Sequence, residues 1–227
     1  MISALIVAGG KGTRMAADRP KQFLALDDRP IIMHTLHAFD RCTIVEHAIA
    51  VFPEHEIPFV ESELLPKAGF RLQWKLVSGG ATRQASVKHG LDAIAEDGGI
   101  VLIHDGVRPL VSEQLIRAVA EGARQWGACI PAIASPDTIK QVDESGLIVA
   151  TPQRNTMRLA QTPQGFQVDL IKKAHAAARE TVVTDDAAMV EAIGGTVRTI
   201  AGDRNNIKIT NPEDLEIASI YFKRTTP

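Results

Sequence analysis

Short apolar runs alternate with helical patterns along most of the chain, and this alternation constrains the fold more than any other feature. The expected strands cover residues 2–8, 47–52, 72–77, 100–104 and 128–134. Between them, apolar residues recur every three or four positions, as they do on one face of a helix. Strands joined through helices need crossover connections, which favour a mainly parallel sheet. The pattern therefore predicts an α/β fold.

The helical patterns can be located by their apolar faces and caps. After Gly80, the side chains of Val87, Leu91 and Ile94 fall on one helical face. A second helix is expected after Pro109, with Ser112 as its N-cap. Further helical patterns occupy residues 169–178, follow the segment 184–186 and begin at residue 211.

Residues 136–166 interrupt this alternation. Two extended runs, residues 138–142 and 147–150, flank a turn at residues 143–146, which is typical of a β-hairpin. The hairpin has no apolar face directed at the core, so we expect it to pack against another surface, such as a second subunit. We interpret the chain as one domain, residues 1–227, with an inserted β-arm at about 136–163.

Length and composition support one ordinary globular domain. The chain has 227 residues, of which 45% are hydrophobic and 23% charged, with a net charge of −2. Such a balance excludes a wholly disordered chain and provides no basic field for a nucleic acid polymer. Small anions are not excluded, because a few local cations bind them.

The location of the protein is inferred from its thiols and its first residues. The two cysteines, Cys42 and Cys129, lie in apolar surroundings without the spacing of a redox pair or metal site, which favours a reducing compartment. The N-terminus has no basic leader and passes directly into a strand. No apolar run is long enough to cross a bilayer. We expect a cytoplasmic protein that does not bind membranes.

A glycine-rich segment at residues 8–15 directly follows the first strand. Glycines let backbone amides approach and surround an anion, and Lys11, Arg14 and Lys21 add positive charge. The spacing fits neither the dinucleotide fingerprint nor the P-loop. The segment predicts a phosphate-binding loop; the alternative is a tight turn with solvated cations.

Two later strand ends also carry residues suited to a nucleotide. Gly79 and Gly80 end the third strand and precede Ser86, a combination that could receive a flat base. Asp105 ends the fourth strand, where a carboxylate is well placed to hold Mg²⁺. We interpret His104 as a core histidine, and Arg108 as either a site residue or one half of a structural ion pair.

Two other polar segments are ambiguous by themselves. Asp185 and Asp186 open a helix, where acids commonly complement the helix dipole. Lys208 lies in an expected short strand, residues 206–210, and a single lysine is usually solvated. No Ser/His/Asp set, Cys/His set or zinc spacing occurs. The residues therefore favour a reaction without a protein nucleophile, in which cations and Mg²⁺ stabilise charge.

Together these motifs resemble the 2-C-methyl-D-erythritol 4-phosphate cytidylyltransferase family, within the wider sugar-nucleotide transferase group. The matching segments follow one another in order along nearly the whole chain: residues 8–15, 20–23, 79–86, 104–109, 137–140, 161–164, 184–187 and 206–210. Any one segment is weak evidence, but eight in register are strong evidence. The resemblance implies a Rossmann-like, mainly parallel sheet of the nucleotide-diphospho-sugar transferase type.

The resemblance also implies a reaction: CTP and 2-C-methyl-D-erythritol 4-phosphate give 4-diphosphocytidyl-2-C-methyl-D-erythritol and pyrophosphate, in non-mevalonate isoprenoid biosynthesis. Catalytic roles fall on Arg14, Lys21 and Lys208. CTP binding falls on Ala8, Gly9, Gly10, Gly12, Gly80, Ala81, Ser86, Asp105 and Gly106, with Asp105 also the ligand of Mg²⁺ or another divalent cation. Binding of the polyol phosphate falls on Thr138, Arg154, Thr162 and Thr184. The family's hairpin embraces a partner subunit, which implies a homodimer with Thr138 and Arg154 serving the neighbouring site.

The sequence departs from the family at a few positions. Ala81 and Gln153 stand where many members carry an acid, so Ala81 can offer only its backbone. The chain ends at Pro227, which predicts that the fused cyclodiphosphate synthase domain of some relatives is absent. Three alternatives stay open: a ribitol 5-phosphate cytidylyltransferase, a non-catalytic nucleotide-binding regulator, and an interaction scaffold without a ligand.

Overall fold

A computed structural model describes residues 1–9, 19–95, 98–178 and 183–225 of the chain. Its strands are β1 (Ile2–Val7), β2 (Ala25–Leu26), β3 (Arg29–Pro30), β4 (His47–Phe52), β5 (Trp74–Ser78), β6 (Ile100–Asp105), β7 (Ala128–Ala134), β8 (Gln141–Val142), β9 (Ile148–Ala150), β10 (Arg158–Ala160), β11 (Gln164–Gln167) and β12 (Arg198–Ala201). Its α-helices are α1 (Ile31–Arg41), α2 (Ile57–Phe59), α3 (Arg83–Asp92), α4 (Glu113–Trp126), α5 (Val168–Ala177), α6 (Asp186–Ala192) and α7 (Pro212–Thr225). None of these helices has the length and apolar character needed to cross a membrane.

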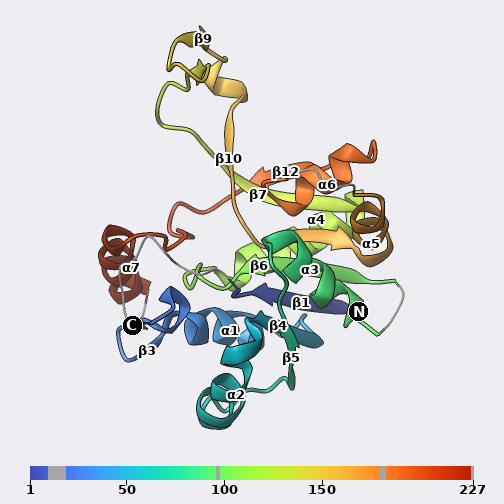
Figure 1. Cartoon of the computed structure of the whole chain (residues 1–227), viewed down its shortest axis with the longest axis vertical. Coiled ribbons are helices and arrows are strands. Elements are labelled where there is room, and N and C mark those ends of the chain that lie inside the picture. Colours follow the sequence, from blue (N-terminus) through green and yellow to red (C-terminus); the bar gives the residue numbers. More distant parts are fainter. Residues whose placement is uncertain (10–18, 96–97, 179–182, 226–227) are drawn as a thin grey trace.

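A central sheet organises these elements (Figure 1). Within the described residues its strand order is β10-β7-β11-β6-β1-β4-β5, with β12 paired to β7. The pairs of β1 with β4 and β6, of β4 with β5, and of β7 with β12 are parallel. Strand β11 is antiparallel to β6 and β7, and β10 is antiparallel to β7. The expectation of a mainly parallel α/β sheet is confirmed.

Helices cover both faces of this sheet. Along β1, Ile6 packs into the cluster that contains Leu36 of α1 and Ile116 of α4. The neighbouring Leu5 points the other way and packs with Leu91 of α3. Because successive side chains of a strand alternate between faces, β1, which is apolar except for Ser3, contributes to both cores, as expected of a parallel strand buried on two sides.

The expected helix starts are confirmed by side-chain caps. The Ser112 hydroxyl accepts a hydrogen bond from the Leu115 amide at 3.2 Å. The Asn211 side chain likewise accepts from the Asp214 amide at 2.9 Å. Each cap satisfies one of the amides that a helix leaves unpaired in its first turn.

The expectation of a strand at residues 206–210 is wrong. These residues do not belong to a strand, although the Ile209 amide donates to the Val107 carbonyl at 2.9 Å. The alternation of Ile207 and Ile209 suggests a strand, but neighbouring polar groups serve tertiary contacts: the Asn206 side chain donates to the Thr162 carbonyl at 2.8 Å. The last strand of the sheet is β12, which lies earlier in the chain.

The interrupted segment contains a small hairpin that projects beyond the sheet (Figure 1). Strands β8 and β9 pair with each other and are shorter than the extended runs expected from the sequence. Their turn is closed by Asp143, whose carboxylate accepts from the Ser145 amide at 2.9 Å, and by Gly146 at φ 86°. Val142 and Leu147 are 52% and 67% exposed, so this projecting hairpin presents apolar side chains to solvent.

Candidate functional site

The Asp105 carboxylate lies at the carboxyl end of β6 and is surrounded by three cations. Its Oδ2 atom is 2.9 Å from Lys208 Nζ and 3.6 Å from Arg108 Nε, and its Oδ1 atom is 3.4 Å from Arg83 Nε. The register of β6 with β1 pairs Asp105 with Val7. The cluster therefore lies beside the segment that follows β1, at the edge where open parallel sheets bind ligands.

The charge state of this cluster follows from burial and from the ion pairs. Burial by itself would raise the pKa of Asp105, but the charges of Arg83, Lys208 and Arg108 outweigh it and hold that pKa well below its usual range. Burial would lower the pKa of Arg83, and its two carboxylate partners raise it instead. Arg108 differs, because burial dominates and lowers its pKa. The carboxylate is thus ionised, with cationic groups on several sides.

Arg83 joins this cluster to a second buried acid. Its Nη1 atom is 2.8 Å from Oδ2 of Asp186, which is 1% exposed at the start of α6. Gln164 holds the same helix start, since its side-chain oxygen accepts from the Asp186 and Ala187 amides at 3.1 Å. Arg83 was not among the site residues predicted above. The sequence feature that could have identified it is its position: Arg83 is the first residue of a helix that follows a strand ending in two glycines.

The neighbouring Asp185 has the role that its position predicts. Its carboxylate accepts from the Ala188 amide at 3.0 Å and so caps α6. Only Asp186, the second acid of the pair, reaches the cluster around Asp105 through Arg83. The two adjacent acids therefore have different functions, one local and one tertiary.

His104 is a buried, hydrogen-bonded histidine, as expected. Its Nε2 lies 3.1 Å from the Arg108 carbonyl, which can only accept, so Nε2 is the protonated nitrogen. Its Nδ1 therefore accepts a hydrogen bond from the Thr162 hydroxyl at 3.0 Å. The oxygen of that hydroxyl in turn accepts a hydrogen bond from the Asp105 amide at 3.1 Å. Burial lowers the pKa of His104 to about 3. The neutral ring thus connects the turn after β6 to the start of β11.

Glycines that follow two strands lie where a side chain would not fit. A Cβ at Gly80 would lie 2.4 Å from Ala85 Cβ, and one at Gly106 would lie 2.8 Å from Ile32 Cδ1. The Ser86 hydroxyl accepts from the Gly80 amide at 3.1 Å and donates to the Thr82 carbonyl at 2.9 Å. Ala8 and Gly9 follow β1 on the same edge. Contacts within the protein hold the turn at Gly80 in place.

Other predicted site residues either are outside the described residues or occupy a turn or a loop. Arg14, Gly10 and Gly12 are outside the described part of the chain. Lys21 begins a 3₁₀ turn, residues 21–23, near the start of α7, where its charge is among the influences that lower the pKa of Asp214. Thr184 and Ala81 are exposed at loop positions.

The two predicted arm residues belong to the segment that projects beyond the sheet. Thr138 and Arg154 are both exposed, and Arg154 Nη1 donates to the Pro136 carbonyl at 3.2 Å. This bond joins the two legs of the arm. A single chain thus brings Asp105, Gly106, Thr162 and Lys208 together, while these two side chains belong to the projecting segment.

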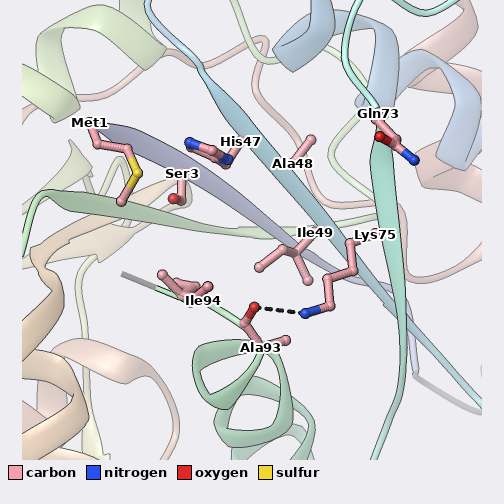
Figure 2. Close-up of a pocket in the computed structure, with 10 residues that line it drawn as sticks. Met1, Ser3, His47, Ala48, Ile49, Gln73, Lys75, Ala93 and Ile94 are labelled. Atoms are coloured by element: carbon pink, nitrogen blue, oxygen red, sulfur yellow. Dashed lines mark hydrogen bonds between the residues drawn. The ribbon is translucent and has the colours of Figure 1, made fainter. Parts of the chain in front are cut away.

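A separate hollow of about 190 Å³ lies at the opposite edge of the sheet (Figure 2). It opens between the first residues of β1, β4 and β5 and the end of α3. Lys75 Nζ donates to the Ala93 carbonyl at 3.0 Å across it. The described residues that line it include no carboxylate. The Asp105 edge is therefore the stronger candidate for phosphate and metal chemistry.

Comparison with known proteins gives one consistent result. Residues 2–224 match the family described as 2-C-methyl-D-erythritol 4-phosphate cytidylyltransferase. A protein of that name from Geobacter metallireducens is 42% identical over 231 residues, covering 100% of this chain and 99% of its own length. Another from Syntrophotalea carbinolica is 45% identical over 224 residues, covering 97% and 96%.

Solved structures agree with the sequence comparison. The crystal structure of 4-diphosphocytidyl-2C-methyl-D-erythritol synthase from Anaerococcus prevotii has a TM-score of 0.86 and 32% identity, covering 98% of this chain and 96% of that chain. The 2-C-methyl-D-erythritol 4-phosphate cytidylyltransferase of Thermus thermophilus has a TM-score of 0.78 and 35% identity, covering 97% and 98%. The expected fold type and family resemblance are both confirmed.

Burial of a neutral His104 predicts a measurable loss of stability in acid. Between its usual pKa of 6.5 and its folded pKa of about 3, the unfolded chain binds a proton here that the folded chain does not. Lowering the pH through this window therefore reduces the free energy of unfolding, by at most about 1.4 kcal/mol per pH unit from this group. We expect His104→Gln, which keeps a donor for Arg108, to flatten this slope in urea unfolding between pH 7 and 5.

The matched control for this experiment is His47→Gln, which replaces an exposed histidine on β4. It should leave the slope of the wild type unchanged. Equal slopes for the wild type and His104→Gln would contradict the assignment of a neutral, buried ring.

Proposed function

Because the chain belongs to the 2-C-methyl-D-erythritol 4-phosphate cytidylyltransferase family, we propose that it transfers CMP from CTP to the phosphate of 2-C-methyl-D-erythritol 4-phosphate. The products are 4-diphosphocytidyl-2-C-methyl-D-erythritol and pyrophosphate, in non-mevalonate isoprenoid biosynthesis. The chain is an enzyme, a cytidylyltransferase. The observation that supports its site most directly is the Asp105 carboxylate among three cations at the ligand-binding edge of the sheet.

The chemistry proposed for this site is in-line attack by the polyol phosphate on the α-phosphorus of CTP. Such a reaction depends on positioning and on stabilisation of charge, not on a protein nucleophile. Lys208 suits the second task, because its side chain is 40% exposed while its Nζ lies 2.9 Å from Asp105. That ammonium can turn toward a phosphate without losing its anchored backbone. We assign Arg14 and Lys21 to the same role, stabilisation of the charge that develops on the phosphates.

The nucleotide is proposed to lie along residues that follow β1, β5 and β6. Ser86 offers a specific contact: its hydroxyl already donates one bond and accepts one, so one lone pair is left. A free acceptor matches the exocyclic amino group of cytosine. The other proposed contacts with CTP are Ala8, Gly9, Gly10, Gly12, Gly80, Ala81, Asp105 and Gly106.

A divalent cation, Mg²⁺ in the first place, fits the donor set at this edge. Within the described residues, no group of three His, Cys, Asp or Glu side chains could hold a metal by itself. Mg²⁺ commonly uses one or two carboxylates together with substrate phosphates and waters, so Asp105 alone suits a cation that arrives with the triphosphate. Such a cation would neutralise phosphate charge; Asp105 would orient it.

The second substrate is proposed to contact residues from two subunits. Thr162 and Thr184 belong to the body of the chain, whereas Thr138 and Arg154 belong to the arm. Exposed apolar side chains on the arm support a homodimer: Ile148 and Val149 are 55% and 54% exposed, and pairing would remove them from water. We place the enzyme in the cytoplasm, since Cys42 and Cys129 are buried and free.

The function is tested by pyrophosphate release from CTP and Mg²⁺ with two different polyol phosphates. We expect kcat/KM with 2-C-methyl-D-erythritol 4-phosphate to exceed that with ribitol 5-phosphate by at least about tenfold, because a site that hydrogen-bonds the hydroxyl groups of one polyol discriminates against another that places them differently. The reverse preference would identify a ribitol 5-phosphate cytidylyltransferase. Binding of CTP without release of pyrophosphate in the presence of either polyol phosphate would identify a nucleotide-binding regulator.

Sharing of the site between subunits is tested by mixing two inactive variants. Arg154→Ala removes the arm contribution, and Lys208→Ala removes the contribution of the body. If Arg154 serves the neighbouring site, each mixed dimer has one intact site, so an exchanged equimolar mixture should recover about a quarter of wild-type turnover.

The matched control mixes Lys21→Ala with Lys208→Ala. Both residues belong to the body of one chain, so every site in a mixed dimer keeps one defect and turnover should not recover. A shared site would be contradicted if the mixture containing Arg154→Ala recovered no more turnover than this control mixture. A monomer mass by light scattering would contradict it as well.

A further inference from the structure

A second large groove, of about 560 Å³, lies outside the Asp105 cluster. It is bounded by α1, by the loop that leads from β6 into α4, and by the last turns of α7, with Arg29 of β3 at one side. None of the three cations that contact Asp105 lines it. In Figure 1, β3 and α7 lie at the same end of the molecule, beside α1.

Positive charge in this groove comes chiefly from Arg41. Its guanidinium is exposed at the end of α1 and has no hydrogen bond or ion pair within the described part of the chain. Arg29 adds a second guanidinium, which shares its charge with Asp28 at 2.9 Å. His37 lies on the same helix between them; burial lowers its pKa first, and the charges of Arg29 and Arg41 lower it further. Arg41 is therefore the guanidinium in this groove whose charge is not shared with a described carboxylate.

Two acids among the described residues line the groove, Glu113 and Asp203. Glu113 Oε1 accepts from Arg117 Nη2 at 2.6 Å, and Asp203 Oδ1 accepts from the Asn205 amide at 2.8 Å. The first bond pairs Glu113 with a cation, whereas the second leaves Asp203 with its negative charge. Arg41 is therefore the cation of this groove for which the described residues give no ion-pair partner.

The remaining walls are suited to an apolar, flat group. Pro109 and Leu110 form one side, and the rings of Tyr221 and Phe222 form another. Phe222 is fixed by an edge contact with His34, at 4.7 Å between ring centroids. A ligand with both an anionic head and an apolar body would match this combination of surfaces.

The groove also lies against the outer side of the catalytic turn. Pro109 directly follows Arg108, and Thr35 of α1 donates to the Gly106 carbonyl at 2.9 Å. A ligand bound there would thus rest on residues next to the turn that holds Asp105.

We propose that this groove is a second anion-binding site, separate from the nucleotide site, for a phosphomonoester with a flat apolar body. The phosphate contacts Arg41, and the apolar body lies between the loop after β6 and the rings of α7. The site does not depend on the identity of the second substrate of the enzyme.

The probe for this site is phenyl phosphate, titrated calorimetrically into protein saturated with CTP and Mg²⁺. Loss of one charge-assisted contact should weaken binding about fivefold or more, so we expect this effect in Arg41→Gln. The matched control is Arg124→Gln, at an exposed arginine of α4 whose partner is Glu121, and it should bind as the wild type does. Neither variant should change turnover.

Three outcomes would overturn the proposal. In the first, phenyl phosphate does not bind the wild type. In the second, it binds Arg41→Gln as tightly as the wild type. In the third, the affinity for phenyl phosphate falls in Lys208→Ala and not in Arg41→Gln. The last outcome would place the probe in the catalytic site. Inorganic phosphate, titrated in parallel, should bind more weakly than phenyl phosphate, and equal affinity would contradict the apolar half of the site.

Discussion

The buried charge of Asp105 is the constraint on which the rest of the site depends. An ionised carboxylate that is 7% exposed is costly unless cations and hydrogen bonds surround it. Here one cation, Arg108, follows in the same turn, and the other two, Arg83 and Lys208, come from separate parts of the chain. Each can reach the carboxylate only if α3, the turn after β6 and the segment before α7 are correctly placed. The fold and the site are therefore formed together.

Hydrogen bonds behind this cluster maintain its geometry. His104 and Thr162 join the end of β6 to the start of β11, and Gln164, two residues later, holds the first turn of α6. Arg83 then links that helix to Asp105. A reaction that depends on positioning benefits from such support, because a small displacement of a charge weakens its effect on a transition state.

Much of the framework could be predicted from sequence because its signals are local. Largely apolar runs mark β1 and β6, and Ser112 marks the start of α4. Asp105 is recognisable because it ends a buried strand. Arg83 could not be assigned in the same way, since its two acid partners lie far away in sequence. The segment around Lys208 resembles a strand locally, and only tertiary contacts decide that it is not one.

The central claim is that CTP binds where Asp105 and its cations meet the glycine-ended strands. The most direct test is a crystal structure of the enzyme with CTP and Mg²⁺. The account predicts density for the nucleotide at the carboxyl edge of β1, β5 and β6, with the Asp105 carboxylate beside the ribose or the metal. Nucleotide density elsewhere, such as in the hollow between β4 and the end of α3, would contradict it.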